Sequence, residues 1–220
     1  MENKGRIVII SGFSGAGKGT LMKALMKEYK DKYALSVSAT TRAPRPGEKD
    51  GVDYFFVTKE QFESMIEKEE LIEYAQYVGN YYGTPKAYVD EQLLAGKNVI
   101  LEIEIQGALK IKEKFPETVL MFVTAPSPEC LKERLVGRAT ETPEVIEARL
   151  SRACEEAEGI ENYDYIVVND TIEAGVALID RLIENERMGK VADNQSHRVS
   201  ANIDYINHMR TELKRFAKGE

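Results

Sequence analysis

A glycine-rich segment near the start of the chain has the residues that phosphate binding requires. The segment Gly12-Phe-Ser-Gly-Ala-Gly-Lys-Gly-Thr20 follows a short apolar run rich in β-branched residues and precedes a helix-forming stretch. In that order of strand, loop and helix, a G-x-x-x-x-G-K pattern binds phosphate. Its glycines let the backbone turn tightly and point N–H groups at phosphate oxygens, while the helix adds its positive end. We interpret the segment as a phosphate loop in which Lys18 supplies a mobile charge, rather than as a simple connecting turn.

A second group of residues combines arginines with aromatic side chains. Arg42 and Arg45 lie in a proline-rich loop, where the stiff backbone allows two guanidinium groups to converge on one anion. Arginine suits this role because its planar group grips phosphate through two hydrogen bonds. Tyr54 and Tyr82 can add phenolic donors. The alternative is a solvated basic loop whose arginines pair with a carboxylate such as Glu48.

A third candidate is Glu73, which lies in an aromatic-rich run, Glu73-Tyr-Ala-Gln-Tyr-Val-Gly-Asn-Tyr-Tyr82-Gly-Thr84. The run is typical of a strand. A carboxylate buried in such a strand needs a partner, because an unpaired buried charge is costly. The alternative is an ordinary glutamate on the surface of a strand.

Composition limits the classes of function. The chain has 220 residues, a formal net charge of −7 and a pI near 5.2, which argue against a nucleic-acid binder and against a protein that binds anionic membranes. No apolar run approaches the roughly 20 residues of a membrane span, and no signal peptide is evident. The two cysteines lack metal-type spacing and both histidines lie near the end of the chain, so zinc and imidazole chemistry are poor candidates. We expect a cytoplasmic protein.

Strand-like apolar runs alternate with helical patterns, which favours an α/β fold with a parallel sheet and crossover helices. The runs cover residues 6–11, 34–38, 98–103, 118–124 and 165–169. Three helix starts carry a capping hydroxyl: Thr58 with Gln61 three residues later, Ser127 before Pro128, and Thr142 before Pro143.

Two segments break this alternation. Residues 40–82 hold the proline-rich loop and strand-like runs at 54–57 and 71–78, which predict an inserted subdomain with its own antiparallel strands. Residues 126–159 predict two helices around an arginine-bearing loop, a second insertion. After residue 186, apolar residues recur at three- and four-residue spacing: Ile203, Ile206, Met209, Leu213 and Phe216. We expect that stripe to pack on the main domain; a dimer contact is the alternative.

Together these motifs resemble the guanylate kinase family in content, order and spacing. The resemblance rests on the phosphate loop with its Gly-Lys-Gly-Thr end, Thr41-Arg-Ala-Pro-Arg-Pro-Gly-Glu48, Asp53-Tyr54, Glu73-Tyr-Ala-Gln76 and Asn80-Tyr-Tyr-Gly83. It covers about residues 6–180. It implies a P-loop kinase fold, an α/β parallel sheet flanked by helices, with an inserted subdomain for the nucleoside monophosphate and a helical lid. We therefore expect a single guanylate-kinase-like domain, with core segments at about 5–39, 83–125 and 160–186, a GMP-binding subdomain at 40–82, a lid at 126–159 and a tail at 187–220.

The resemblance also implies roles for individual residues on the acceptor side. Arg42, Arg45, Tyr54 and Tyr82 match positions that hold the phosphate of GMP, and Glu48 belongs to the same motif. Ser38, Glu73 and Thr84 match the positions that read guanine; the family usually has Ser where Thr84 stands, which preserves a hydroxyl. Glu102, also expected at the acceptor site, stands where the family typically has Asp and keeps the charge with one more methylene.

On the donor side the resemblance implies ATP as the phosphoryl donor and Mg²⁺ as the metal. The expected ATP-binding residues are Gly12, Phe13, Ser14, Gly15, Ala16, Gly17, Lys18, Gly19, Thr20 and Asn169. Gly19 follows Lys18 where many phosphate loops have a hydroxyl residue, so Thr20 is the expected metal-side residue, mostly through water. Arg138 and Arg149 match lid arginines that reach the transferring phosphates, and with Lys18 and Arg42 they are the expected catalytic residues. For Arg149 and Arg152, a salt-bridged helix face with Glu144 or Glu155 is the alternative.

These observations predict an ATP:GMP phosphotransferase that makes GDP and ADP, with dGMP as a second acceptor, acting as a monomer or homodimer and without nucleic-acid or membrane partners. Two other functions are compatible with parts of the pattern. One is a scaffold module of guanylate-kinase type that binds phosphorylated peptides, although such modules typically have eroded phosphate loops. The other is a kinase for a different phosphorylated small molecule, which should lack the guanine-reading residues.

Overall fold

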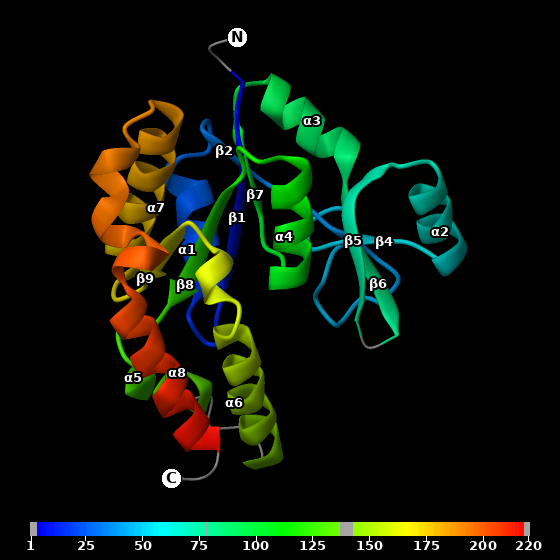
Figure 1. Ribbon diagram of the computed structural model, residues 1–220. Helices are drawn as coiled ribbons and strands as arrows, with labels where there is room; N and C mark the ends of the chain where they lie inside the picture. Colours follow the sequence, from blue (N-terminus) through cyan, green and yellow to red (C-terminus); the bar gives the residue numbers. More distant parts are fainter. Residues whose placement is uncertain (1–3, 78, 137–142, 218–220) are drawn as a thin grey trace. The chain divides into compact units, whose positions relative to one another are not determined.

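The computed structural model describes residues 4–77, 79–136 and 143–217, and the chain divides into two compact units (Figure 1). Unit 1 contains residues 4–7 and 30–118, and unit 2 contains residues 8–29 and those from 119 onward. Among the helices in these described ranges, none has both the length and the apolar composition that crossing a membrane requires.

Unit 2 is built on parallel strands in the order β1, β8, β9. These strands are buried almost throughout, as expected of a parallel sheet covered on both faces. Helices α1 and α7 pack against each other beside the strands. The elements of this unit are β1 Ile7–Gly12, α1 Lys18–Glu28, β8 Val119–Thr124, α5 Pro128–Val136, α6 Pro143–Ala157, η1 Ile160–Asn162, β9 Tyr165–Val168, α7 Ile172–Arg187, η2 Val191–His197, η3 Val199–Ala201 and α8 Ile203–Ala217.

Unit 1 contains a parallel pair, β2 with β7, and a separate four-stranded sheet in the order β4, β3, β6, β5. In that small sheet β6 runs antiparallel to both β3 and β5, whereas β3 and β4 are parallel. The elements of this unit are β2 Tyr33–Leu35, β3 Ala39–Thr40, β4 Phe55–Phe56, α2 Lys59–Glu67, β5 Leu71–Tyr77, β6 Asn80–Pro85, α3 Lys86–Leu94, β7 Asn98–Leu101 and α4 Ile105–Lys114.

The small sheet has one apolar face and one polar face. Successive side chains of a strand point to opposite faces, and one face packs on α2 around the fully buried Phe62. Phe62 also lies against Gly83, where an added Cβ would come 2.9 Å from its ring. The residues on the α2 side are Ala39, Phe55, Val57 and Tyr81. The alternate positions Thr40, Phe56, Tyr82 and Thr84 therefore belong to the opposite face, which is free to carry chemistry.

The predicted elements agree with the structure in type and, within a few residues, in position. The five predicted core strands correspond to β1, β2, β7, β8 and β9. The two strands predicted in the inserted segment are β4 and β5; β5 is antiparallel to β6 as expected, whereas β4 pairs in parallel with β3. The capping box of α2 forms, because the Thr58 hydroxyl accepts from the Gln61 N–H, and Ser127 accepts from the Cys130 N–H at the start of α5. Thr142 lies outside the described residues. Sequence reasoning missed β3 and β6, and β6 crosses the predicted subdomain boundary between residues 82 and 83.

The C-terminal segment packs on its own unit, as predicted for its apolar stripe. Ile206, Met209 and Leu213 are buried, and α8 lies along α6 and against α5 (Figure 1). Polar contacts hold the same interface: Arg210 donates to the Ala157 carbonyl at 2.8 Å, and Lys214 pairs with Glu158 at 2.7 Å. The segment is therefore an integral part of the fold of unit 2.

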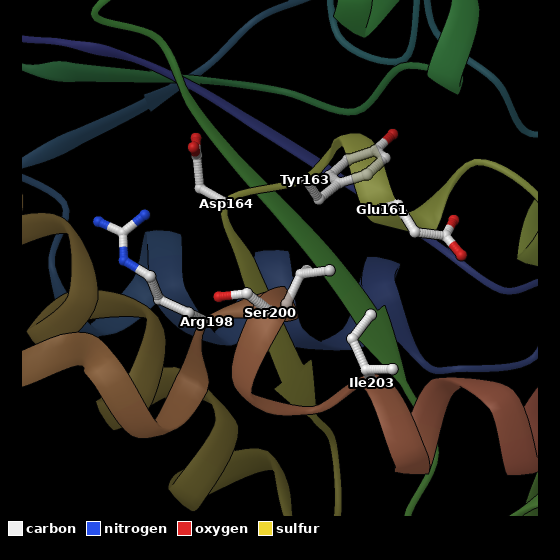
Figure 2. A pocket seen from close by; sticks show the side chains of 7 residues that line it. Glu161, Tyr163, Asp164, Arg198, Ser200 and Ile203 are labelled. Carbon is white, nitrogen blue, oxygen red and sulfur yellow. The ribbon is translucent and has the colours of Figure 1, made fainter.

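A shallow pocket lies where the start of this segment meets η1 and β9 (Figure 2). Its walls include Tyr163 and Asp164 on one side and Arg198, Ser200 and Ile203 on the other. The Asp164 carboxylate accepts from the Leu120 N–H at 2.9 Å, and the Arg198 guanidinium lies over the Tyr165 ring. These charged groups are occupied in holding the fold together, and none of the lining residues is a predicted site residue.

The burial of the α8 stripe predicts how its residues differ in their contribution to stability. Leu213 is fully buried, whereas Ile203 is 38% exposed. Leu213→Ala should lower the free energy of unfolding by about 2–4 kcal/mol, because it removes packed methyl groups and leaves a cavity. Ile203→Ala, the matched control on the same helix, should cost less than about 1 kcal/mol. Urea unfolding measures both values. Equal losses in the free energy of unfolding would contradict the conclusion that the buried side of α8 stabilises the fold.

Candidate functional site

The phosphate loop of unit 2 has a backbone shape that glycine alone tolerates. Gly15 and Gly17 have φ values of 82° and 86°, in the left-handed region. There is also no room for side chains at the ends of the loop: a Cβ on Gly12 would lie 2.2 Å from the Val123 carbonyl oxygen. Gly17 is the N-cap of α1, so the first-turn N–H groups of that helix face the loop without a capping side chain. The predicted strand, loop and helix are thus all present.

Two side chains complete the loop. The Lys18 ammonium donates to the carbonyl oxygens of Gly12 and Phe13 at 2.5 and 3.1 Å, so it folds back over the loop. Asn169, which follows β9, is 3% exposed, and its amide donates to the Ala16 carbonyl at 2.7 Å. Asn169 therefore supports the loop from inside the protein. Thr20 lies exposed on the first turn of α1.

Helix α6, which belongs to the segment predicted to form a lid, presents a charged face to this loop. Arg149, Arg152 and Glu156 are spaced three and four residues apart, which places them on one side of the helix. Glu156 accepts a hydrogen bond from the Ser14 N–H at 3.0 Å, so that side faces the phosphate loop. Arg152 pairs with Glu156 at 3.3 Å; the side chain of Glu144, one of the two predicted partners, lies outside the described part of the chain. Arg138 lies outside the described residues.

Arg42 and Glu48 form the centre of the candidate phosphate site in unit 1. One Arg42 nitrogen donates to both Glu48 oxygens at 2.9 Å, and the Arg45 N–H donates to Glu48 at 2.7 Å. These two partners, the backbone N–H first, lower the pKa of the Glu48 carboxyl. The Arg42 guanidinium also lies over the Tyr54 and Phe56 rings, 5.2 and 5.8 Å from their centroids. Arg42 is thereby held in one place, at the polar face of the small sheet.

Tyr54 and Tyr82 flank that arginine. Their ring centroids are 6.1 Å apart, with the rings nearly perpendicular. Burial raises the pKa of the Tyr54 phenol, which keeps it protonated and able to donate a hydrogen bond. Arg45, by contrast, is exposed on the loop. The structure thus brings Arg42, Glu48, Tyr54 and Tyr82 together, and it places Arg45 next to them in sequence with its side chain toward solvent.

Glu73 is a buried carboxylate with a hydroxyl partner. It is 7% exposed on β5, and the Thr84 hydroxyl on β6, fully buried, donates to its Oε1 atom at 2.9 Å. Its Oε2 atom lies beside α4, where a Cβ on Gly107 would come within 3.1 Å. Burial raises the pKa of the Glu73 carboxyl, against the opposing effect of the Thr84 hydrogen bond and two lysines. Such a carboxylate can accept two parallel hydrogen bonds from a ligand that carries adjacent N–H groups.

Two further residues are predicted for the acceptor site, Ser38 and Glu102. Ser38 immediately precedes β3, and its carbonyl accepts from the Phe55 N–H at 2.9 Å, which joins it to the edge of the small sheet. Glu102 follows β7 and is exposed. Within the described part of the chain no group of three or more His, Cys, Asp or Glu residues could hold a metal ion. A metal here would rely on Thr20 and on the oxygens of a bound phosphate, as Mg²⁺ commonly does.

Sequence reasoning missed two residues that shape the loop. Glu156 contacts the loop from 142 positions away. Its spacing of seven residues from Arg149 puts both on one helix face, but it does not predict the contact with the loop. Arg134 on α5 donates to the Asn169 carbonyl at 3.0 Å and carries no sequence signal of its own.

Comparison with known proteins places this geometry in one family. The guanylate kinase family model matches residues 4–186. A guanylate kinase from Halalkalibacterium halodurans is 55% identical over 185 residues, covering 84% of this chain and 90% of that protein. One from Latilactobacillus sakei is 47% identical over 188 residues, covering 86% and 93%. The crystal structure of guanylate kinase from Anaplasma phagocytophilum matches with a TM-score of 0.68 at 34% identity, covering 86% of this chain and 89% of that one.

The matched residues span most of the chain and include both the phosphate loop and the small sheet of unit 1. The solved relative confirms the mostly parallel sheet flanked by helices, the α/β fold of P-loop kinases. This chain belongs to the guanylate kinase family.

Proposed function

We propose that this protein transfers the γ-phosphoryl group of ATP to GMP, with Mg²⁺, to give ADP and GDP. The observation that carries the proposal is the buried pair of Glu73 and Thr84 on the same polar sheet face as Tyr82. On that side of the sheet, the Glu73 carboxylate can accept from adjacent N–H donors, and Arg42 can bind a phosphate group. Family membership supports the same activity.

The base assignment follows from hydrogen-bond chemistry. Guanine presents two adjacent donors, N1–H and the 2-amino group, beside an acceptor at O6. Glu73 accepts from both donors, and the Ser38 hydroxyl donates to O6. The Thr84 hydroxyl, which donates its single proton to Glu73 in this structure, turns from Glu73 to O6 when guanine binds. Adenine presents an unprotonated N1 instead, which would leave the buried carboxylate facing a lone pair. Sites of this kind reject a mismatched ligand by roughly 10⁴-fold, because their polar groups remain unpaired.

The phosphate of GMP is assigned to Arg42, Arg45, Tyr54 and Tyr82. Glu48 acts as a positioning residue, because it accepts two hydrogen bonds from Arg42 and fixes the direction of the guanidinium. The partners that hold Glu48 ionised keep this pair intact at neutral pH. A second acceptor, dGMP, would use the same contacts, since none of them requires the 2′-hydroxyl. Glu102, beyond the end of β7, is assigned to the same acceptor site.

The donor is assigned to the phosphate loop, with Lys18, Arg138 and Arg149 as the cationic groups. An oxygen of the GMP phosphate bonds to the γ-phosphorus as the bond to the β–γ bridging oxygen breaks, and ADP leaves. The protein contributes alignment and charge neutralisation. When bound, Mg²⁺ would supply further positive charge at the β and γ phosphates, held by Thr20 mostly through water. We further propose a cytoplasmic monomer or homodimer.

The direct test is a coupled assay with ATP and a panel of nucleoside monophosphates. GMP should be the preferred acceptor by orders of magnitude, with dGMP next and AMP and pyrimidine nucleotides far behind. Turnover of another acceptor in preference to GMP would contradict the proposal. Binding of a phosphorylated peptide without any turnover would favour a scaffold module instead.

Glu73→Gln tests the base assignment. An amide offers one acceptor and introduces donors that face the donors of guanine, so kcat/KM for GMP should fall by about 10²–10³-fold, and AMP should improve relative to GMP. Glu70→Gln, the same substitution at an exposed position of the same segment, serves as the control and should leave the ratio unchanged. An unchanged GMP/AMP ratio in Glu73→Gln would show that Glu73 does not read the base.

Lys18→Ala tests the donor assignment. Loss of the charge on the β and γ phosphates should lower kcat by two or more orders of magnitude. The dissociation constant for GMP, measured by calorimetry, should change less than about threefold, because GMP is assigned to the other unit. Lys23→Ala, on the exposed side of the same helix, is the matched control. Near-normal turnover in Lys18→Ala would contradict this role of the lysine.

The burial of Glu73 also predicts a pH dependence of stability. Because its pKa is raised in the folded protein, the folded state holds the proton more tightly than the unfolded state does. The resulting stabilisation is complete below the unfolded pKa and is lost as pH rises through the folded pKa. Glu73→Gln mimics the neutral form, so its stability relative to the native protein should increase between about pH 4 and pH 8. Urea unfolding at both pH values, with Glu70→Gln as control, measures this; a constant difference would contradict it.

A further inference from the structure

A carboxylate of the lid helix contacts the phosphate loop. The Ser14 N–H, in the middle of the loop, donates to the Glu156 Oε2 atom at 3.0 Å, and Arg152 donates through Nε to Oε1 of the same carboxylate at 3.3 Å. The Glu156 side chain is 22% exposed, so the contact is partly shielded from water. Both residues lie on the face of α6 that also carries Arg149.

The Ser14 N–H and the Arg152 guanidinium, which both hydrogen-bond to this carboxylate, are groups of the kinds that hold phosphate. Backbone N–H groups of a glycine-rich loop and an arginine side chain are the standard partners of phosphate oxygens. Glu156 presents to them a negative charge and two acceptor oxygens, which makes it a small internal substitute for a phosphate group. In the same structure the Lys18 ammonium is also engaged with protein acceptors, the carbonyls of Gly12 and Phe13. Donors of the loop are thus paired within the protein, as buried donors generally are.

We propose that Glu156 is a positioning residue that holds the phosphate loop in its nucleotide-free state and is displaced by the phosphates of the donor nucleotide. The inference rests on the proposed function, in which this loop binds ATP. A carboxylate and a polyphosphate repel each other and cannot share one N–H donor. When the nucleotide binds, Ser14 and Arg152 therefore lose their hydrogen bonds to Glu156 and donate to phosphate oxygens instead.

This exchange has two consequences. It lowers the apparent affinity for the nucleotide, because only the fraction of molecules with Glu156 displaced can bind it fully. It also couples the occupancy of the loop to helix α6, since displacement breaks a link between loop and lid. Arg152, which lies on the same helix face as Arg149, is then released from the Glu156 carboxylate when phosphate arrives.

Glu156→Gln is the test, because it removes the charge and keeps the size of the side chain. Calorimetry should give a dissociation constant for ADP about threefold to tenfold lower than in the native protein, the scale of one charged hydrogen bond that is exchanged rather than lost. Glu155→Gln makes the same charge change at the neighbouring exposed position and should leave the constant within about twofold. Glu156→Ala, which should also tighten ADP binding, guards against an effect peculiar to glutamine.

A second measurement reports on the hydrogen bond itself. The amide resonance of Ser14 should differ between the nucleotide-free native protein and nucleotide-free Glu156→Gln, and the two should coincide once ADP is bound. Unchanged or weaker ADP binding in both Glu156 variants would overturn the inference, as would a Ser14 resonance that still differs in the ADP-bound forms. If the native protein does not bind ADP at all, the proposed function fails together with the inference. Normal ADP binding without a Glu156 effect overturns the inference alone.

Discussion

The structure depends above all on the close approach of the phosphate loop to the ends of β8 and β9. The loop lies directly on the backbone of Val123, so that a single methyl group at Gly12 would overlap it. On the other side the Asn169 amide fills the space where a side chain at Gly17 would stand, and it hydrogen-bonds to Ala16. A backbone packed this tightly has one shape, and its N–H groups have fixed directions. Preorganised donors of this kind stabilise developing charge without a cost of reorganisation during the reaction.

The small sheet of unit 1 serves both packing and binding, because its two faces carry different residues. Alternation along its strands gives one face to the packing around Phe62 and the other to Tyr82 and Thr84, and Arg42 follows shortly after β3. Glu73 is the costly member of that face, because a carboxylate is buried there with one hydroxyl as its direct partner. Retaining an unfavourable group in a small core is the usual trade of stability for specificity.

Much of this arrangement could be predicted from the sequence. The phosphate loop, the five core strands and the capping box at Thr58 follow from local pattern, since glycine position, β-branched runs and hydroxyl spacing act over a few residues. β3 was missed because it has only two residues, and β6 because it is polar on one face. Their pairing is decided by α2 and by the aromatic residues packed against it. The partners of the loop were harder still. Neither the contact of Glu156 with Ser14 nor that of Arg134 with the Asn169 carbonyl leaves a local signature, because each joins segments that are distant in sequence.

The order of residues in unit 2 has a consequence for how the protein is made. The loop is synthesised well before its partners, because its contacts from Ser14 to Glu156 and from Ala16 to Asn169 span 142 and 153 positions. Closing such long loops is slow, and folding rates fall as contacts become less local. On the ribosome, unit 1 can emerge and fold while the strands that complete unit 2 are still being translated. A nascent chain therefore carries the phosphate-loop sequence long before it has a phosphate-binding site, and the capacity to bind nucleotide arises only when β9 has emerged and docked.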